Sequence, residues 1–151
     1  MRRGEKEIKD RSEMEEFIKQ NRVCRLAMVD QDKPYVVPMS FGFDWPCIYF
    51  HSALEGRKIN VIQQNSNICF EFDELIKINK DKEACQWGMD FKSVIGEGNA
   101  VLVEDINEKI HALGIIMAQY SNRQFHFSEE NMEKTGVIKV SITRMTGKKS
   151  A

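Results

Sequence analysis

The sequence contains no apolar run approaching the length of about 18 residues from which a membrane-spanning helix is inferred. Its N-terminal segment, MRRGEKEIKDRSEMEEF, carries too many charges for the apolar core of a secretory signal. We therefore expect a cytoplasmic protein without membrane contact. A formal net charge of −1 shows no excess of either sign, so charge gives no reason to expect nucleic acid or an anionic membrane as a partner.

Patterns that hold metals or disulfide frameworks are also missing. The four cysteines, none in a C-x-x-C pair, are Cys24, Cys47, Cys69 and Cys85. The three histidines, which show no H-E-x-x-H spacing, are His51, His111 and His126. We expect buried free thiols and no metal site, since cysteines within apolar strand-like runs usually behave as small hydrophobic residues.

What is present fits an ordinary globular domain. A chain of 151 residues with 42% hydrophobic and 30% charged residues is large enough for one core, so we expect a single domain over residues 1–151. Apolar alternation predicts strands over residues 23–30, 34–43, 48–52, 67–74 and 137–145, with two more around a polar turn at 79–82. Gly96 and Gly98 lie within the second of those two and predict a bulge or a barrel corner.

Helices are few. Capping-box pairs predict helices that begin after Ser12 and after Asp105, the second with an apolar stripe over 106–120, and Ser128 predicts one further helical turn. The helices are too few for alternating βαβ units. The prediction is therefore a mainly β fold, an antiparallel β-barrel with peripheral helices.

The strand over residues 34–43 has two unequal faces. Bulky side chains on one face predict core, and they belong to Tyr35, Val37, Met39, Phe41 and Phe43. Small or polar residues form the other face, and they are Val36, Pro38, Ser40 and Gly42. Pro38 also lacks a backbone donor, so this face is expected to border something other than packed side chains.

The segment IYFHSALEGRKINVIQQN places Arg57 and Lys58 near the start of a helix, where cations are disfavoured by about 0.3–1 kcal/mol each. In one interpretation, Ser52 and Glu55 cap a helix that begins near Ala53, and both cations are solvated surface charges. In the other, Gly56 keeps the backbone open, the helix begins near Arg57, and an anion binds the free N–H groups together with both cations and the Ser52 hydroxyl. The aromatic strand before the turn, and the small face beside it, favour the second interpretation and an aromatic mononucleotide.

Three segments carry a family resemblance. They are CRLAMVDQDKPYVVPMSFGFD, IYFHSALEGRKINVIQQNSNICFEFDE and FKSVIGEGNAVLVED. Together they resemble the pyridoxamine 5′-phosphate oxidase-like flavin-binding split-barrel superfamily, and within it the Nim branch of 5-nitroimidazole resistance proteins. The resemblance implies a six-stranded antiparallel split β-barrel that forms a homodimer, with FMN, or alternatively FAD, bound in clefts between the subunits.

The resemblance also implies roles for individual residues. Ser52, Arg57 and Lys58 would hold the phosphate. Pro38, Met39, Ser40 and Phe41 would edge the isoalloxazine ring, and His51 would lie near it. Ser93 is a further candidate for cofactor contact, and Trp87 is expected to reach the ring from the partner subunit. Phe41, Phe70 and the helix over 106–120 are expected at the dimer interface.

Two functions follow from the resemblance. The first is an oxidoreductase that reduces nitroimidazoles or related small aromatic molecules, with His51 as a catalytic proton donor because histidine titrates near neutrality. The second is a non-catalytic flavin-binding or redox-sensing protein. The additional basic C-terminal residues that hold the substrate phosphate in true pyridoxamine 5′-phosphate oxidases have no counterpart in RMTGKKS, so we do not expect that activity.

Overall fold

The computed structural model describes residues 4–150. Eight strands form one sheet with the order β3-β2-β6-β7-β8-β5-β4, and β1 pairs with β8. All pairings are antiparallel. The strands are β1 (Glu7–Ile8), β2 (Cys24–Asp30), β3 (Lys33–Met39), β4 (Gly42–Asp44), β5 (Cys47–Ser52), β6 (Asn67–Asn79), β7 (Gly88–Leu102) and β8 (Gly136–Ser150).

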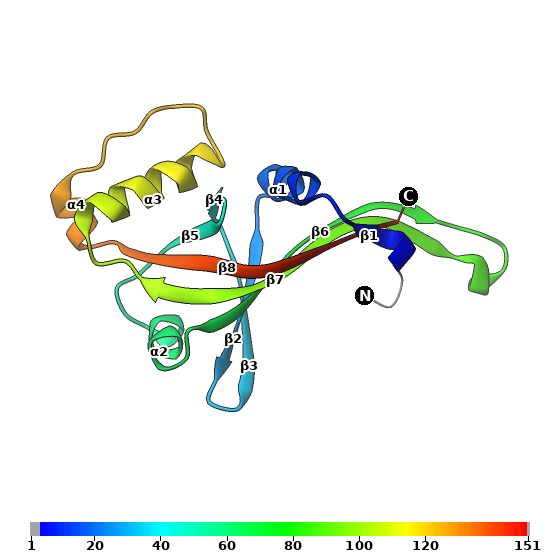
Figure 1. The fold of residues 1–151 in the computed structure, drawn as a ribbon, viewed down its shortest axis with the longest axis horizontal. Helices are drawn as coiled ribbons and strands as arrows, with labels where there is room; N and C mark the ends of the chain where they lie inside the picture. The colour runs from blue at the N-terminus through cyan, green and yellow to red at the C-terminus, as the bar shows by residue number, and fades with distance from the viewer. Residues whose placement is uncertain (1–3, 151) are drawn as a thin grey trace.

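The helices lie at the periphery of this sheet (Figure 1). They are α1 (Arg11–Gln20), α2 (Arg57–Gln64), α3 (Ile106–Ala118) and α4 (Glu129–Glu133), with single 3-10 turns η1 (Gly4–Lys6) and η2 (Ala84–Gln86). Asp105 caps α3 by accepting from the Glu108 N–H, and Ser128 caps α4, as predicted. For α1 the predicted cap was wrong: Asp10, not Ser12, is the N-cap, because its carboxylate accepts from the Ser12 N–H at 2.9 Å.

The two edge strands, β3 and β4, are joined by only Ser40 and Phe41. Met39 pairs with Cys24 of β2, whereas Gly42 pairs with Tyr49 of β5 at the other end of the sheet order. The sheet therefore curls until β3 and β4 come close together without pairing, and this open split barrel has eight strands where six were expected. The sequence predicted one strand over 34–43 because the apolar alternation continues through the point where the chain changes its partner.

The core lies inside the curl. Its fully buried side chains come from β2, β5, β6, β7 and β8, from α1 and from the β3–β4 link, and the largest are Phe41, Phe50, Phe70 and Phe72. Phe41 and Phe43 are buried and Tyr35, Val37 and Met39 pack against the same cluster, which confirms the bulky face as core. Because Phe41 and Phe70 have no exposed surface, the expectation that their side chains contribute to a dimer interface was wrong.

Two strand boundaries differ from the prediction. Residues 67–79 form the single strand β6, with a register irregularity between Leu75 and Lys77, where two strands were expected. β8 continues through Ser150, although the predicted strand ended at residue 145. Backbone pairing with β7 and β1 extends the strand there, while the side chains remain at the surface. The register shift between Glu97 and Gly98 confirms the bulge predicted from the glycines.

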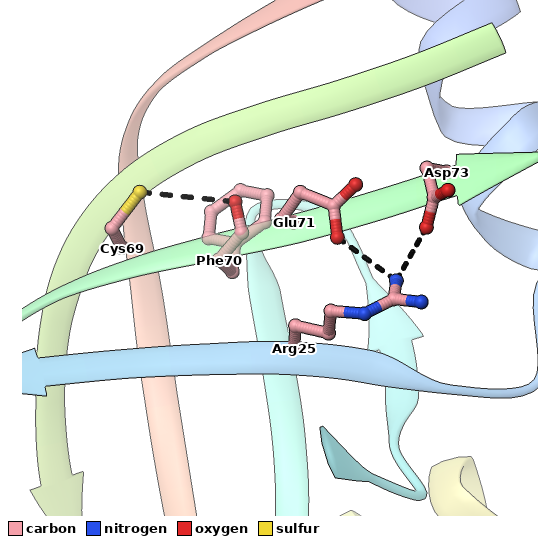
Figure 2. A network of polar contacts seen from close by, with 5 residues as sticks. All are labelled: Arg25, Cys69, Phe70, Glu71 and Asp73. Carbon is pink, nitrogen blue, oxygen red and sulfur yellow. Dashed lines mark hydrogen bonds and ion pairs between the residues drawn. The ribbon is translucent and has the colours of Figure 1, made fainter. Parts of the chain in front are cut away.

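The outer face of β2 and β6 carries a polar cluster around Arg25 (Figure 2). The Arg25 guanidinium donates through Nη1 to Glu71 Oε2 at 3.0 Å and to Asp73 Oδ1. Burial, and secondly the adjacent Asp73 carboxylate, raise the pKa of Glu71. The charged form of Glu71 is therefore disfavoured, and the cluster braces two strands without adding much stability at neutral pH.

The cysteines among the described residues are free thiols. Cys24 and Cys47 are buried, as predicted, and burial raises the pKa of the Cys24 thiol well above its usual range. Cys69 is half-buried with its Sγ 4.0 Å from the Phe70 carbonyl, and Cys85 is exposed in η2, so the prediction of burial was wrong for Cys85. No described helix is both long and apolar enough to cross a bilayer.

Candidate functional site

The turn between β5 and α2 decides between the two helix starts that the sequence allowed, near Ala53 or near Arg57. Gly56 is the N-cap of α2 with φ 126°, and α2 begins at Arg57. This φ is one that only glycine adopts at little cost. No side chain caps the helix, and its first turn contains no acidic residue. The first-turn N–H groups are thus available to an anion, and the cap formed by Ser52 and Glu55 is absent.

Arg57 is held in place by the β2–β3 hairpin. Its Nε donates to Asp30 Oδ2 at 2.8 Å, and its guanidinium carbon lies 4.2 Å from the centre of the Tyr35 ring. Asp30 and Tyr35 therefore hold a long side chain that would otherwise lose rotamer entropy on binding a ligand. The Asp30 ion pair is surface-exposed and contributes at most about 1 kcal/mol.

Lys58 differs from Arg57 because no ion pair among the described residues holds it, although Glu55 lines the same cavity. It is half-buried and forms no ion pair with residues 4–150. Burial lowers the pKa of the Lys58 ammonium. A bound anion would compensate that cost of desolvation.

A cavity of about 200 Å³ brings the predicted phosphate-binding residues together. Ser52, Gly56, Arg57 and Lys58 line it, with the Tyr35 ring as a wall. Ser52 Oγ donates to the Ala53 carbonyl at 2.8 Å and would have to rotate to reach a ligand in the cavity. One helix N-terminus, two cations and one hydroxyl converge here, which is the donor set that a phosphate monoester requires.

A second cavity has a volume of about 260 Å³. One wall contains Ser40 and His51, the residue of β5 that precedes Ser52. Its other wall is α3, with Leu113, Ile116, Met117 and the adjoining Tyr120. The His51 side chain is exposed. The lining is largely apolar apart from Ser40, His51 and the Tyr120 hydroxyl, so this cavity suits a flat apolar group with a polar edge.

The predicted apolar stripe of α3 forms the wall of this second cavity and is not the most buried face of the helix. The stripe residues Leu113, Met117 and Tyr120 line the cavity, whereas the most buried side chains of α3 are Ala112, which does not line it, and Ile116, which does. The stripe therefore marks the site more than the core.

The link between β3 and β4 is fixed by Tyr120. The Phe41 N–H donates to Tyr120 Oη at 2.9 Å, and Tyr120 Oη donates to the Arg22 carbonyl at 2.8 Å. Phe41 itself is buried and, of this link, only Ser40 lines one of the two cavities. Pro38 is exposed and Met39 half-buried next to this link, and neither lines the two cavities.

Two predicted cofactor residues lie away from both cavities in the same chain. Ser93 lies in the first half of β7, next to the projecting β6–β7 hairpin, and pairs with Asp73 of β6 and Lys148 of β8. Trp87 follows η2 at the end of the long β6–β7 hairpin, is 51% exposed, and donates from Nε1 to the Asp81 carbonyl at 2.7 Å. Contact between these residues and a flavin stays a prediction that involves a second subunit.

Sequence reasoning missed several residues of the site. Asp30 and Tyr35 hold Arg57, and Tyr120 holds the β3–β4 link, but Tyr35 was assigned only to the core and Asp30 only to the end of a strand. Tyr120 continued the i, i+3, i+4 stripe beyond the end of α3, and that continuation was the one signal available.

A larger cavity, of about 640 Å³, lies between α1, β4 and the end of α3. It contains none of the predicted cofactor residues, and its size therefore does not make it the better candidate. Arg22 and Gln119, on its wall, donate to backbone carbonyls at the end of α1, and Arg22 also donates to the Gln119 carbonyl at the end of α3.

Replacing Tyr120 with phenylalanine tests the role of its hydroxyl. We expect Tyr120→Phe to lower the free energy of unfolding by about 1–2 kcal/mol, because the half-buried Phe41 N–H and the Arg22 carbonyl both lose a partner. Urea unfolding measures this loss. Tyr35→Phe is the control and should change little, since Arg57 packs on a ring that phenylalanine keeps. Equal stability of Tyr120→Phe and the wild type would contradict the bracing role.

The fold of the chain is similar to the folds of known proteins. A candidate 5-nitroimidazole antibiotic resistance protein from Bacteroides thetaiotaomicron is 37% identical, with a TM-score of 0.85, over 94% of this chain and 85% of that one. A flavocytochrome from Azotobacter vinelandii matches with a TM-score of 0.87 at 19% identity, over 100% of this chain and 72% of that one. An FAD-binding protein from Mesorhizobium loti matches with a TM-score of 0.69 at 22% identity, over 94% and 96%.

The two more distant matches show the shared split-barrel fold alone. The search of curated proteins gave no significant match. The sequence pattern of the family described as Pyridoxamine 5′-phosphate oxidase matches residues 10–149, which is most of the chain. Together with the similar structure at 37% identity, this match shows that the chain belongs to the pyridoxamine 5′-phosphate oxidase family, in the branch of the 5-nitroimidazole resistance proteins.

Proposed function

We propose that this protein binds FMN and uses it to reduce nitroimidazoles or related small aromatic molecules. The observation that carries the proposal is the start of α2, where an uncapped helix N-terminus, Arg57, Lys58 and Ser52 face one cavity. Structures of the same fold that are described as a flavocytochrome and an FAD-binding protein support a flavin as the ligand. FAD would satisfy the same phosphate site, and FMN is the simpler ligand for a cavity of about 200 Å³.

When bound, a flavin supplies hydride or electron transfer, and the protein supplies position and surroundings. Arg57, Lys58 and the first turn of α2 hold the phosphate end. The backbone at Ser40 and Phe41, which Tyr120 braces, would border the ring edge. Leu113 and Met117 give the adjacent cavity an apolar wall that excludes water from a stacked aromatic substrate.

His51 is the proton donor in this proposal. Its imidazole lines the cavity beside α3, is exposed, and is hydrogen-bonded to none of the residues that the structure describes. It can therefore turn toward a substrate without breaking an existing contact. Because an imidazole ring N–H can donate a proton, His51 is suited to protonate a reduced nitro group.

The proposed assembly is a homodimer with one flavin in each of two clefts between subunits. The β6–β7 hairpin projects from the body of the molecule (Figure 1). Large apolar side chains on it are about half exposed, namely Leu75, Ile76, Ile78, Trp87 and Met89. A projecting apolar arm suits a second copy of the chain, and it would bring Trp87 to the partner's flavin. Sedimentation of a flavin-loaded monomer would contradict this assembly.

Stopped-flow spectroscopy tests the catalytic part of the proposal. The flavin-loaded protein is reduced with a nicotinamide nucleotide and then mixed with a nitroimidazole under anaerobic conditions. We expect rapid reoxidation of the flavin on mixing, and formation of the amine when excess nicotinamide nucleotide supplies the six electrons that reduction of a nitro group to an amine requires. Reoxidation no faster than that caused by air, without amine, would instead support a non-catalytic flavin-binding or redox-sensing protein.

The affinity for FMN should also depend on pH through Lys58. Burial holds the pKa of the free Lys58 ammonium below its usual value, and a bound phosphate would raise it again. Binding of FMN therefore takes up protons. The affinity for FMN is highest below the pKa of Lys58 in the free protein, and it falls as the pH rises through the alkaline range toward the pKa of Lys58 in the complex. Titrations with FMN at several pH values measure this decline.

Lys58→Arg serves as the control, because arginine stays charged throughout that range. Ionisation of the flavin ring affects both proteins equally and cancels in the comparison. The same pH dependence in the wild type and in Lys58→Arg would rule out Lys58 as the titrating group.

A further inference from the structure

The structure also contains a buried cation that the proposed flavin site does not use. Lys109, in the first turns of α3, is 7% exposed and is the one charged side chain found buried among residues 4–150. Its ammonium donates to the Met132 carbonyl at 3.0 Å. No carboxylate within the described residues forms an ion pair with it. A buried charge is costly without a counterion, so Lys109 lacks compensation.

A purely structural role accounts for part of this arrangement. Met132 lies at the end of α4, where carbonyl groups carry partial negative charge, and its carbonyl also accepts from the Thr135 N–H at 3.3 Å. Lys109 therefore helps to cap α4. An ammonium has three donors, however, and this contact uses one of them. The cap explains neither the missing counterion nor the space beside the side chain.

That space is a cavity of about 240 Å³, which Lys109 lines. Its walls are mostly apolar and include Leu102, Val103 and Val137. Glu104 lies on the same lining and would repel a ligand with a second negative charge. One cation, apolar walls and one repelling carboxylate together select a compact monoanion with an apolar body.

We propose that this cavity is a binding site for a small aromatic or branched monocarboxylate, whose carboxylate group binds the Lys109 ammonium. The carboxylate supplies the missing counterion and takes up the free donors, and the apolar body covers Leu102, Val103 and Val137. The proposal does not depend on flavin binding, because none of the residues assigned to the phosphate or the ring is among the ligand contacts.

The site lies next to the turn that begins α2. Ala53 and Ile59 line both this cavity and the one assigned to the phosphate. Gly136 also lines it and lets β8 approach the turn so closely that a Cβ there would lie 2.4 Å from the Ala53 carbonyl oxygen. A ligand held by Lys109 would therefore rest against the turn that carries Gly56 and Arg57.

Titration of the full-length protein with benzoate, followed by amide NMR, tests the proposal. We expect saturable shifts at Val103, Val137 and Gly136, and at least tenfold weaker binding of benzamide, which has the same shape without the charge. Lys109→Met keeps an apolar stem of similar length and should also weaken benzoate binding at least tenfold. Lys134→Met, which removes an exposed lysine paired with Glu130, should leave benzoate binding unchanged.

Absence of saturable benzoate binding to the wild type would overturn the proposal, and so would equal binding of benzoate and benzamide or full binding by Lys109→Met. If Lys109→Met fails to fold, the comparison of the two probes on the wild-type protein decides the question, because it needs no variant. Loss of flavin binding in any of these samples would bear on the proposed function and not on this site.

Discussion

Replacement of both Arg57 and Lys58 with alanine is expected to weaken FMN binding by about 2–4 kcal/mol, or roughly 30- to 1,000-fold, in a protein that remains folded. Charge-assisted hydrogen bonds contribute about 1.5–3 kcal/mol each and are not fully additive. Both side chains line the cavity at the start of α2, and neither belongs to the core. Folding should survive, because the one ion pair that is lost, Arg57 with Asp30, is exposed.

The matched control is the double variant Arg11→Ala with Lys134→Ala. Arg11 resembles Arg57 in both of its contacts, since it pairs with Glu15 at 3.0 Å and stacks on the Trp45 ring at 4.7 Å. The control therefore removes the same charge and a similar stacking contact at a distance from the cavity. Isothermal titration calorimetry on both proteins measures the difference. Equal affinity of the two variants would return Arg57 and Lys58 to the role of solvated surface charges.

Replacement of Gly42 with alanine should lower the free energy of unfolding by about 3 kcal/mol, toward the upper end of the range for overpacking. A Cβ at Gly42 would lie 2.5 Å from the Ile116 nitrogen and 2.6 Å from the Ile116 Cα. Both are backbone atoms, so no side chain can rotate away, and α3 must shift from β4. Because α3 forms the wall of the second cavity, flavin binding should weaken as well.

Gly114→Ala, in α3, is the control, and it should change the free energy of unfolding in the opposite direction. A Cβ at Gly114 meets nothing within 4 Å, and alanine is favoured over glycine in a helix interior by about 0.5–1 kcal/mol. Urea unfolding should show Gly42→Ala destabilised and Gly114→Ala slightly stabilised. A Gly42→Ala protein as stable as the wild type would mean that α3 is not held as closely to β4 as the structure indicates.

The sequence predicted most reliably those features that repeat with a regular period. Alternating apolar residues identified β2 and β5, and the spacing from Asp105 identified α3. Period alone could not show that residues 67–79 are one strand. In β6 the alternation of buried and exposed residues stops after Phe72, because the rest of the strand leaves the core and enters the projecting hairpin.

The candidate site was predicted in part for a similar reason. A glycine followed by two cations indicated a phosphate turn, but only the backbone φ of Gly56 decides between the two helix starts. Asp30 and Tyr120 are distant in sequence from the residues that they hold, and their roles follow from a sheet that curls to join its edges. Lys109 gave no signal at all, since a lysine on a helix is ordinarily exposed.

The most direct test of the phosphate site compares FMN with riboflavin on the same apoprotein. The two ligands share the ring and differ by the phosphate group, so the ratio of their dissociation constants isolates the contribution of α2, Arg57 and Lys58. We predict that FMN binds at least 100-fold more tightly, and that the ratio falls toward unity in the Arg57→Ala, Lys58→Ala variant. Equal affinity of the wild-type protein for the two ligands, or binding of neither, would contradict the account.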